Sequence, residues 1–352
     1  MMSLGLAIIG YGGMGGWHAE NVQLRVKEFN VIGIYDVRKE ANHKAKENGL
    51  HVYASLQELL EDIKVDVVTI AVPNNFHKEY AIACLKMNKH VICEKPVTMN
   101  AMELEEIMDV AKACKRVFTI HQNRRWDKDY KIVKEIIKQD LIGKVYYIES
   151  RVQGSGRMLH GWRGHKVNGG GMVYDWGVHL FDQILDLVKE PVVSITPKLV
   201  NLYNQEVDDN FKVILTFESG LWVLVEVATN CLCTQPRWHI CGKEGTAVIE
   251  DWSCNGEIVT LKNSAEVTWT EEIVYTAAGP TRTMAPRSDE SKEKLALPNI
   301  ETDWSDYYHN IAGVINDTEE LIVQPEQALR VMKLIDIIFE AGEKQESVTC
   351  RI

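Results

Sequence analysis

The feature that most constrains the fold is a cluster of glycines that directly follows a short apolar run near the N-terminus. The run covers residues 4–9, and the glycines after it have the spacing G-x-G-x-x-G. In a strand–turn–helix unit, the first glycine allows a tight turn, the second lets the backbone approach a pyrophosphate, and the third lets the helix pack closely on the strand. The segment therefore predicts a dinucleotide-binding turn, which consists of Gly10, Tyr11, Gly12, Gly13, Met14 and Gly15.

Asp36 closes the second apolar run, about 20 residues after the last glycine, where dinucleotide-binding folds carry an acidic residue. A carboxylate there accepts hydrogen bonds from ribose hydroxyls and repels the 2′-phosphate of NADP, so we predict NAD, with NADP less favoured. Arg38 and Lys39 lie nearby, and a cation there can tolerate that phosphate. Two simpler interpretations stay open, namely a glycine-rich turn without a ligand and Asp36 as a helix N-cap.

The first 122 residues alternate between apolar runs and stretches with helical spacing. This alternation predicts βαβ units, and hence a doubly wound parallel Rossmann sheet covered by helices on both faces. We therefore expect an NAD-binding domain over residues 1–122. The runs that predict its strands lie at 4–9, 31–35, 65–72, 90–93 and 117–120.

The pattern changes in residues 123–352, where we expect an α/β domain for substrate binding and oligomerisation. Successive strand-like runs without helices between them predict a large, mostly antiparallel open sheet. These runs lie at 144–152, 193–202, 211–217, 221–229, 238–241, 247–250 and 258–262. Helices are predicted at 127–140, 175–188, 303–316 and 325–342, and a loop at 276–302, which contains three prolines.

Composition and charge exclude several classes of protein. The net charge of −11 argues against a nucleic-acid binder, which needs a basic face. The apolar run at the N-terminus is far shorter than a signal sequence or a membrane span, so we expect no membrane partner and a cytoplasmic location. The eight cysteines form no C-x-x-C pair, so we expect reduced thiols and no metal site.

Lys95 is the first candidate for chemistry. It lies in Glu94-Lys95-Pro96, just after the fifth apolar run, and open parallel sheets bind ligands at the carboxyl ends of their strands. We therefore expect Lys95 beside the nicotinamide, although a surface lysine before a proline turn is the simpler interpretation. Trp162 and Arg163 in the glycine-rich loop 154–171 could cover a ring and hold a phosphate.

Asp175 and His179 are the second candidate pair. If their segment is helical, they lie four positions apart and share a face. A histidine that a carboxylate holds is suited to take a proton from an alcohol, because its pKa lies near neutrality. Two alternatives are a purely structural pair and two ligands of a metal, of which the metal is disfavoured by the lack of further ligands at suitable spacing.

Together these segments resemble the Gfo/Idh/MocA family, the group of glucose–fructose oxidoreductase and inositol dehydrogenase. The resemblance covers nearly the whole chain, and E-K-P followed by D-x-x-x-H is its most specific part. The motifs that carry it are GYGGMG at 10–15, Asp36, VPNNFH at 72–77, EKP at 94–96, NRRW at 123–126, WR at 162–163 and GGGMVYDWGVHLFD at 169–182.

The resemblance implies a Rossmann domain followed by an α/β domain whose open sheet is often buried in a homo-oligomer. It implies bound NAD(P) and Lys95, Asp175 and His179 as catalytic residues. Lys95, Trp162, Asp175 and His179 would also bind substrate, as would Arg124 of the NRRW motif. Further contacts with the cofactor would come from Arg38, Pro73, Asn74, His77, Glu94, Trp162 and Arg163.

For the substrate we expect a small polyol or glycoside. The preferred hypothesis is oxidation of a secondary ring hydroxyl of a sugar or glycoside to a ketone, at C3 in the narrowest version. An inositol or other cyclitol dehydrogenase is the alternative. A protein that binds NAD as a sensor or regulator is a further possibility, and so is an enzyme that recycles a tightly bound NAD within each turnover.

Overall fold

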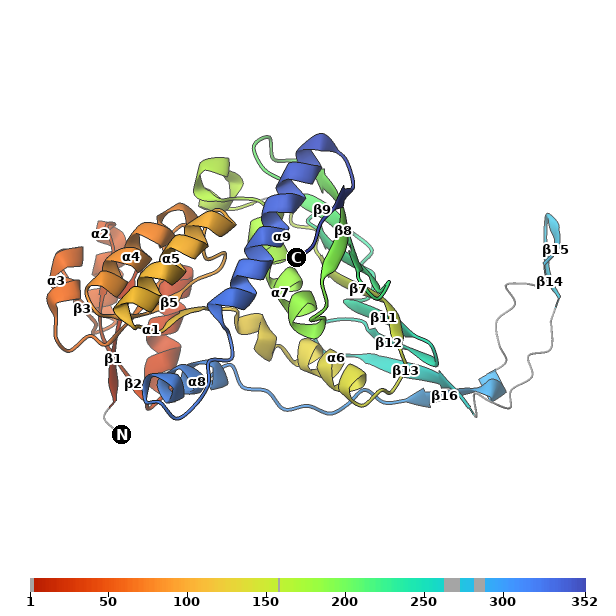
Figure 1. Ribbon diagram of the computed structural model, residues 1–352, viewed down its shortest axis with the longest axis horizontal. Helices are drawn as coiled ribbons and strands as arrows, with labels where there is room; N and C mark the ends of the chain where they lie inside the picture. The colour runs from red at the N-terminus through yellow and green to blue at the C-terminus, as the bar shows by residue number, and fades with distance from the viewer. Residues whose placement is uncertain (1–2, 158, 263–272, 282–288) are drawn as a thin grey trace.

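The computed structural model describes residues 3–157, 159–262, 273–281 and 289–352. Two α/β units lie side by side, one built around a parallel sheet and the other around a larger mixed sheet (Figure 1). The predicted α/β class, a Rossmann sheet followed by a mostly antiparallel sheet, is confirmed. No helix in the described ranges is long and apolar enough to cross a membrane.

The first sheet has the strand order β3-β2-β1-β4-β5-β6, and all its pairs are parallel. This is the strand order of dinucleotide-binding folds. The strands are β1 (Leu4–Ile9), β2 (Phe29–Tyr35), β3 (His51–Val52), β4 (Val67–Ile70), β5 (His90–Cys93) and β6 (Phe118–Ile120). The helices around them are α1 (Gly13–Arg25), α2 (Lys39–Glu47), α3 (Leu56–Glu61), α4 (His77–Lys86) and α5 (Ala101–Cys114).

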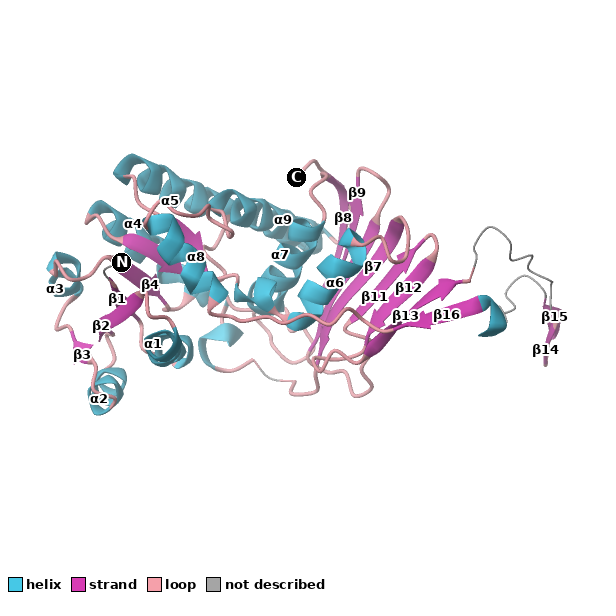
Figure 2. Cartoon of the chain, turned by 90° about the horizontal axis from the view of Figure 1, so that it is seen from below, coloured by secondary structure: helices cyan, strands magenta, loops and turns pink. Residues whose placement is uncertain are grey.

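The second sheet has the order β16-β13-β12-β11-β7-β10-β9-β8-β17. Within the described chain its only parallel pair is β7 with β10. Its strands are β7 (Val145–Gln153), β8 (Val192–Val200), β9 (Asn210–Phe217), β10 (Trp222–Ala228), β11 (Trp238–Gly242), β12 (Gly245–Ile249), β13 (Gly256–Leu261), β16 (Lys292–Leu295) and β17 (Val348–Thr349). Helices α6 (Lys128–Lys138), α7 (Val178–Leu187) and α9 (Pro325–Lys344) lie along one face of this sheet (Figure 2).

The prediction of a loop over 276–302 is partly wrong. Strand β15 (Gly279–Thr281) pairs with β14 (Val274–Thr276), and β16 extends the large sheet by pairing with β13. The sequence of β16 is Lys-Glu-Lys-Leu, and a polar edge strand has no apolar run that would reveal it. Residues 282–288 of the same range lie outside the described residues.

Helix α9 joins the two units. Its apolar positions recur at helical spacing, so one face is buried from Ala328 to Ala341. That face packs against α5 and β6 of the first unit and against α7 and β8 of the second. A short helix, α8 (Asp306–Ile315), completes the C-terminal region. The two units are therefore held by a shared core and not by a flexible linker.

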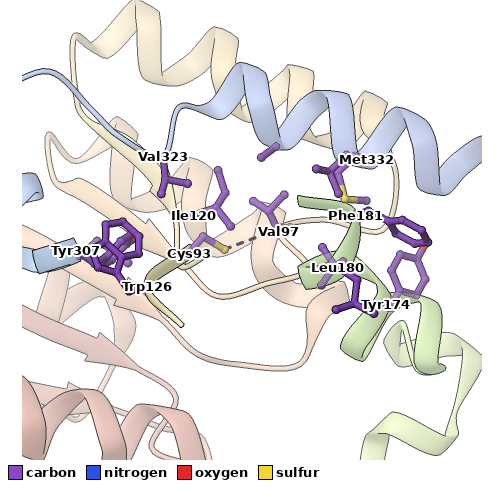
Figure 3. Packing of buried hydrophobic residues seen from close by; sticks show 14 of the residues in the cluster. Cys93, Val97, Ile120, Trp126, Tyr174, Leu180, Phe181, Tyr307, Val323 and Met332 are labelled. Atoms are coloured by element: carbon purple, nitrogen blue, oxygen red, sulfur yellow. Dashed lines mark hydrogen bonds between the residues drawn. The ribbon is translucent and has the colours of Figure 1, made fainter. Parts of the chain in front are cut away.

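The shared core fixes the two segments that matter for chemistry (Figure 3). Cys93 and Val97 flank the loop after β5, and they pack with Leu180 of α7 and Met332 of α9 in one cluster. All four side chains are almost fully buried, and each contributes about 1–3 kcal/mol through removal of apolar surface from water. The loop after β5 and the first turn of α7 are thus clamped against each other.

Candidate active site

The glycine turn between β1 and α1 leaves space for a ligand. A Cβ at Gly10 or Gly15 would overlap backbone atoms, whereas Gly13 faces open space. Helix α1 begins at Gly13, and its N-cap Gly12 makes no side-chain hydrogen bond to the first turn. The free N–H groups and the positive end of the helix dipole therefore suit a pyrophosphate, as a bound dinucleotide would require.

Asp36 follows β2 and marks the other wall of this turn. Its carboxylate accepts hydrogen bonds from the Tyr11 N–H at 2.7 Å, the Arg38 Nη2 at 2.7 Å and the Arg38 Nε at 3.0 Å. Burial acts to raise the pKa of Asp36, but the bonds from Arg38 and Tyr11 outweigh it and leave that pKa below its usual value. The carboxylate is therefore ionised, and an exposed guanidinium lies beside it.

One cleft of about 800 Å³ runs from this turn to the loop after β5 and the start of α7. Most residues predicted to bind cofactor or substrate line it. They are Gly10, Gly12, Gly13, Met14, Asp36, Arg38, Pro73, Asn74, Glu94, Lys95, Arg124, Trp162, Arg163, Asp175 and His179.

Three of the predicted residues do not line this cleft. Gly15 packs under Gly10, and the Tyr11 hydroxyl accepts a hydrogen bond from Asn48. His77 is fully buried, and its ring nitrogens lie 2.9 Å from the carbonyl oxygens of Pro96 and Val72. In this structure His77 therefore fastens the loop after β4 to the loop after β5.

Lys95 and Asp175 meet in the cleft. The Lys95 Nζ donates to the Asp175 carbonyl oxygen at 2.9 Å and to its carboxylate Oδ1 at 3.1 Å. Arg163 donates its Nε to the same Oδ1 at 3.2 Å. Burial acts to raise the pKa of Asp175, but the two cations outweigh it and keep that pKa below its ordinary value. The carboxylate thus holds Lys95 in place from the opposite side of the cleft.

His179 lies in the first turn of α7 and is 5% exposed. Burial, together with the nearby charges of Lys95 and Arg124, holds the pKa of His179 well below its usual value, so the ring is neutral at pH 7. Its Nδ1 is buried and has no hydrogen-bond partner among the described residues. Asp175 therefore does not hold this nitrogen, contrary to expectation.

The reason lies in the local backbone. Asp175 belongs to a single π-helical turn, Val173–Gly177, that precedes α7. Bonds in such a turn run from i to i+5, so residues four apart no longer lie one above the other. The sequence indicated a helix here but not its type, and the carboxylate turns to Lys95 and Arg163 instead.

Arg124 lines another part of the cleft beside Trp176, and it also contacts Trp252. Its guanidinium carbon lies 4.1 Å from the centre of the Trp176 ring and 5.4 Å from that of Trp252. Its Nη1 donates to Asp127 at 2.9 Å. Trp252 comes from the turn between β12 and β13, and nothing near it in the sequence indicated that it reaches this region. Such contacts between a cation and an aromatic face orient the guanidinium firmly.

Glu94 carries a cluster that sequence patterns did not reveal. Its Oε1 lies 2.9 Å from Nε2 of His18 and 2.8 Å from Nδ1 of His121, and all three residues are buried. Their atoms also come close enough together to be ligands of a metal ion. The three residues come from α1, the loop after β5 and the loop after β6, so only the folded sheet brings them together.

Comparison with known proteins identifies the family. A family model described as "Oxidoreductase family, NAD-binding Rossmann fold" matches residues 4–122. The model of the GFO/IDH/MocA C-terminal domain matches residues 130–248. The chain belongs to the Gfo/Idh/MocA family of oxidoreductases. The NAD-binding Rossmann domain and the resemblance noted in the sequence are thereby confirmed.

Individual known proteins are similar over most of the chain. A crystal structure of an NAD-binding protein from Listeria innocua is 43% identical and has a TM-score of 0.96, covering 99% of this chain and 100% of that one. The scyllo-inositol 2-dehydrogenase (NADP(+)) IolW of Bacillus subtilis is 24% identical, covering 97% of this chain and 95% of the relative. The myo-inositol 2-dehydrogenase of Thermotoga maritima is 31% identical, covering 61% of this chain and 65% of the relative.

Proposed function

We propose that this Gfo/Idh/MocA oxidoreductase is an NAD-dependent dehydrogenase that oxidises a secondary ring hydroxyl of a cyclic polyol to a ketone. The observation that carries the proposal is the convergence of Lys95, Asp175 and His179 at one end of the cleft whose other end is the glycine turn. A protein that only sensed NAD would have no need for this set. The names of two relatives, both inositol 2-dehydrogenases, favour a cyclitol.

The chemistry follows from the charge states of these side chains. NAD, when bound, supplies the acceptor for a hydride. Neutral His179 can take the hydroxyl proton, because burial and the neighbouring cations keep it unprotonated. Lys95, oriented by Asp175, can donate a hydrogen bond to the substrate oxygen as negative charge develops on it. Loss of the hydroxyl proton to His179, together with loss of a hydride to the cofactor from the carbon that bears this hydroxyl, would leave a ketone.

Sugars and glycosides are the second substrate class, with C3 of the ring as the narrowest hypothesis. Trp176 lines the cleft and contacts Trp252, which is 50% exposed. Exposed aromatic faces pack well on the apolar face of a pyranose ring. These two side chains therefore favour a substrate that extends beyond a single ring.

We also propose that the protein works as a cytoplasmic homo-oligomer. The face of the large sheet opposite the helices carries Tyr147 stacked on Trp222, with ring centres 5.0 Å apart. Trp222 is 42% exposed, and exposed aromatic side chains are enriched in interfaces.

The test is mass spectrometry of purified protein incubated with NAD and a panel of inositols, sugars and glycosides. Such a readout detects a keto product, lighter by two hydrogens, even if the enzyme retains and recycles its NADH. We expect a product from at least one ring polyol, and none from Lys95→Ala or His179→Ala. Tight binding of NAD without any product across the panel would favour the sensor instead.

A further inference from the structure

Glu94 is a buried carboxylate that pairs with no lysine or arginine among the described residues. Its Oε1 is the acceptor for both His18 and His121, and its Oε2 accepts the Lys95 N–H at 3.2 Å. The side chain is 8% exposed and lines the cleft next to Lys95. Its partners are thus two imidazoles and a peptide group, and the Lys95 ammonium is directed at Asp175 instead.

His18 can make both of its hydrogen bonds without carrying a charge. Its Nε2 can give an N–H to Glu94, and its Nδ1 can then accept a hydrogen bond from the hydroxyl of Tyr308 in α8. A neutral ring has one donor and one acceptor nitrogen, which is what His18 needs here. Burial is the main cause that lowers the pKa of His18. Burial acts to raise the pKa of Glu94, but the proximity of His121 and His18 and their hydrogen bonds outweigh it and hold that pKa well below its usual value, so the carboxylate is ionised.

The position of the Glu94 carboxylate in the cleft determines which form of the cofactor it can attract. The glycine turn and Asp36 would hold the pyrophosphate and the adenosine half, so the nicotinamide half of a bound dinucleotide would lie at the end of the cleft lined by Glu94, Lys95 and His179. The nicotinamide ring is positively charged in NAD⁺ and neutral in NADH. A fixed anion in a buried site attracts the first form and not the second.

We propose that Glu94 is a specificity-determining residue for the oxidation state of the cofactor, and that it strengthens the binding of NAD⁺ relative to NADH. His18 and His121 are positioning residues that keep the carboxylate ionised and aimed into the cleft. This inference uses the family's NAD-binding site but does not require that the substrate is a ring polyol.

The test measures the dissociation constants of NAD⁺ and NADH for the purified full-length protein, by isothermal titration calorimetry. Glu94→Gln replaces the anion with a neutral group of the same shape. We expect this variant to raise Kd(NAD⁺)/Kd(NADH) about tenfold, as expected for removal of one charge at partly buried range. Glu94→Asp keeps the charge and should keep the ratio near that of the wild type, even if both affinities fall.

The matched control is Asp36→Asn, which removes a carboxylate from the adenosine end of the same cleft. The adenosine half is identical in NAD⁺ and NADH, so this variant should change both constants by the same factor. If Glu94→Gln does not fold, Glu94→Ala provides the same comparison. An unchanged ratio in the neutral variant that folds, or a ratio that shifts equally in Glu94→Asp, would overturn the proposal. Because no polyol is present, this result is independent of the substrate test.

Discussion

Arg125 and Asp182 form a buried ion pair that joins the end of the first sheet to the helix that carries His179. The guanidinium donates to both carboxylate oxygens, at 2.7 and 2.6 Å, and the two side chains are 5% and 2% exposed. Arg125 also bonds Gln327 at the start of α9. In Asp182→Asn, the buried guanidinium would keep only the more distant Asp186 carboxylate, 3.8 Å from its Nη1, and this loss costs about 3 kcal/mol, the low end for a broken buried pair.

The assay is thermal unfolding of Asp182→Asn beside the wild type and the double variant Arg125→Met/Asp182→Leu. We expect Asp182→Asn to lower the Tm by roughly 4 °C, because an unfolding entropy of about 2.1 cal/mol/K per residue over 352 residues converts 1 kcal/mol into about 1.4 °C. The double variant should recover most of this loss, because two apolar side chains leave no unpaired charge. A shift below about 2 °C for Asp182→Asn would refute the reasoning, and so would a double variant less stable than the single one.

Three further predictions follow from individual contacts. Asp36→Ala should improve NADP binding relative to NAD by about tenfold, because it removes the repulsion of the 2′-phosphate; fluorescence titration with both cofactors measures this. Gly15→Ala should abolish NAD binding because its Cβ would overlap the Gly10 carbonyl, whereas Gly16→Ala, where a Cβ faces open space outside the cleft lining, should retain it. Burial raises the pKa of Asp208 to about 7. The protonated carboxyl therefore contributes its full stability below about pH 4. This contribution, up to about 4 kcal/mol, is lost as the pH rises from there through 7. Asp208→Asn should therefore lose less Tm between pH 5 and pH 8 than the wild type.

Sequence patterns predicted the elements whose cause is local. The run before Gly10 and the apolar segment before Lys95 both form buried parallel strands, and their observed ends match the predicted ones within about two residues. Strands β3, β14, β15, β16 and β17 were missed. They have two to four residues, and β16 is polar, so their pairing depends on a neighbouring strand and not on an apolar run of their own.

Contacts made across the fold were harder to predict. The proximity of Glu94 to His18 and His121 depends on the order of strands in the sheet, and that of Arg124 to Trp252 depends on a hairpin of the other unit. No spacing within one segment encodes such contacts, because residues distant in sequence meet only when the core is packed. Sequence could therefore name Glu94 as a residue of the cleft, but not the cluster that sets its charge.

The segment from Gly171 to His179 combines both situations. Its motif placed Asp175 and His179 correctly in the cleft, yet the π-helical turn gave Asp175 other partners than the one expected. Such turns occur frequently at functional sites. The wider backbone changes the direction of side chains that would share one face in a regular helix. Here the Asp175 carboxylate does not bond the imidazole of His179 and instead accepts hydrogen bonds from Lys95 and Arg163. In the proposed reaction, the proton acceptor His179 and the hydrogen-bond donor Lys95 are thus positioned by different groups. A substitution at Asp175 should therefore disturb the position of Lys95 before that of His179.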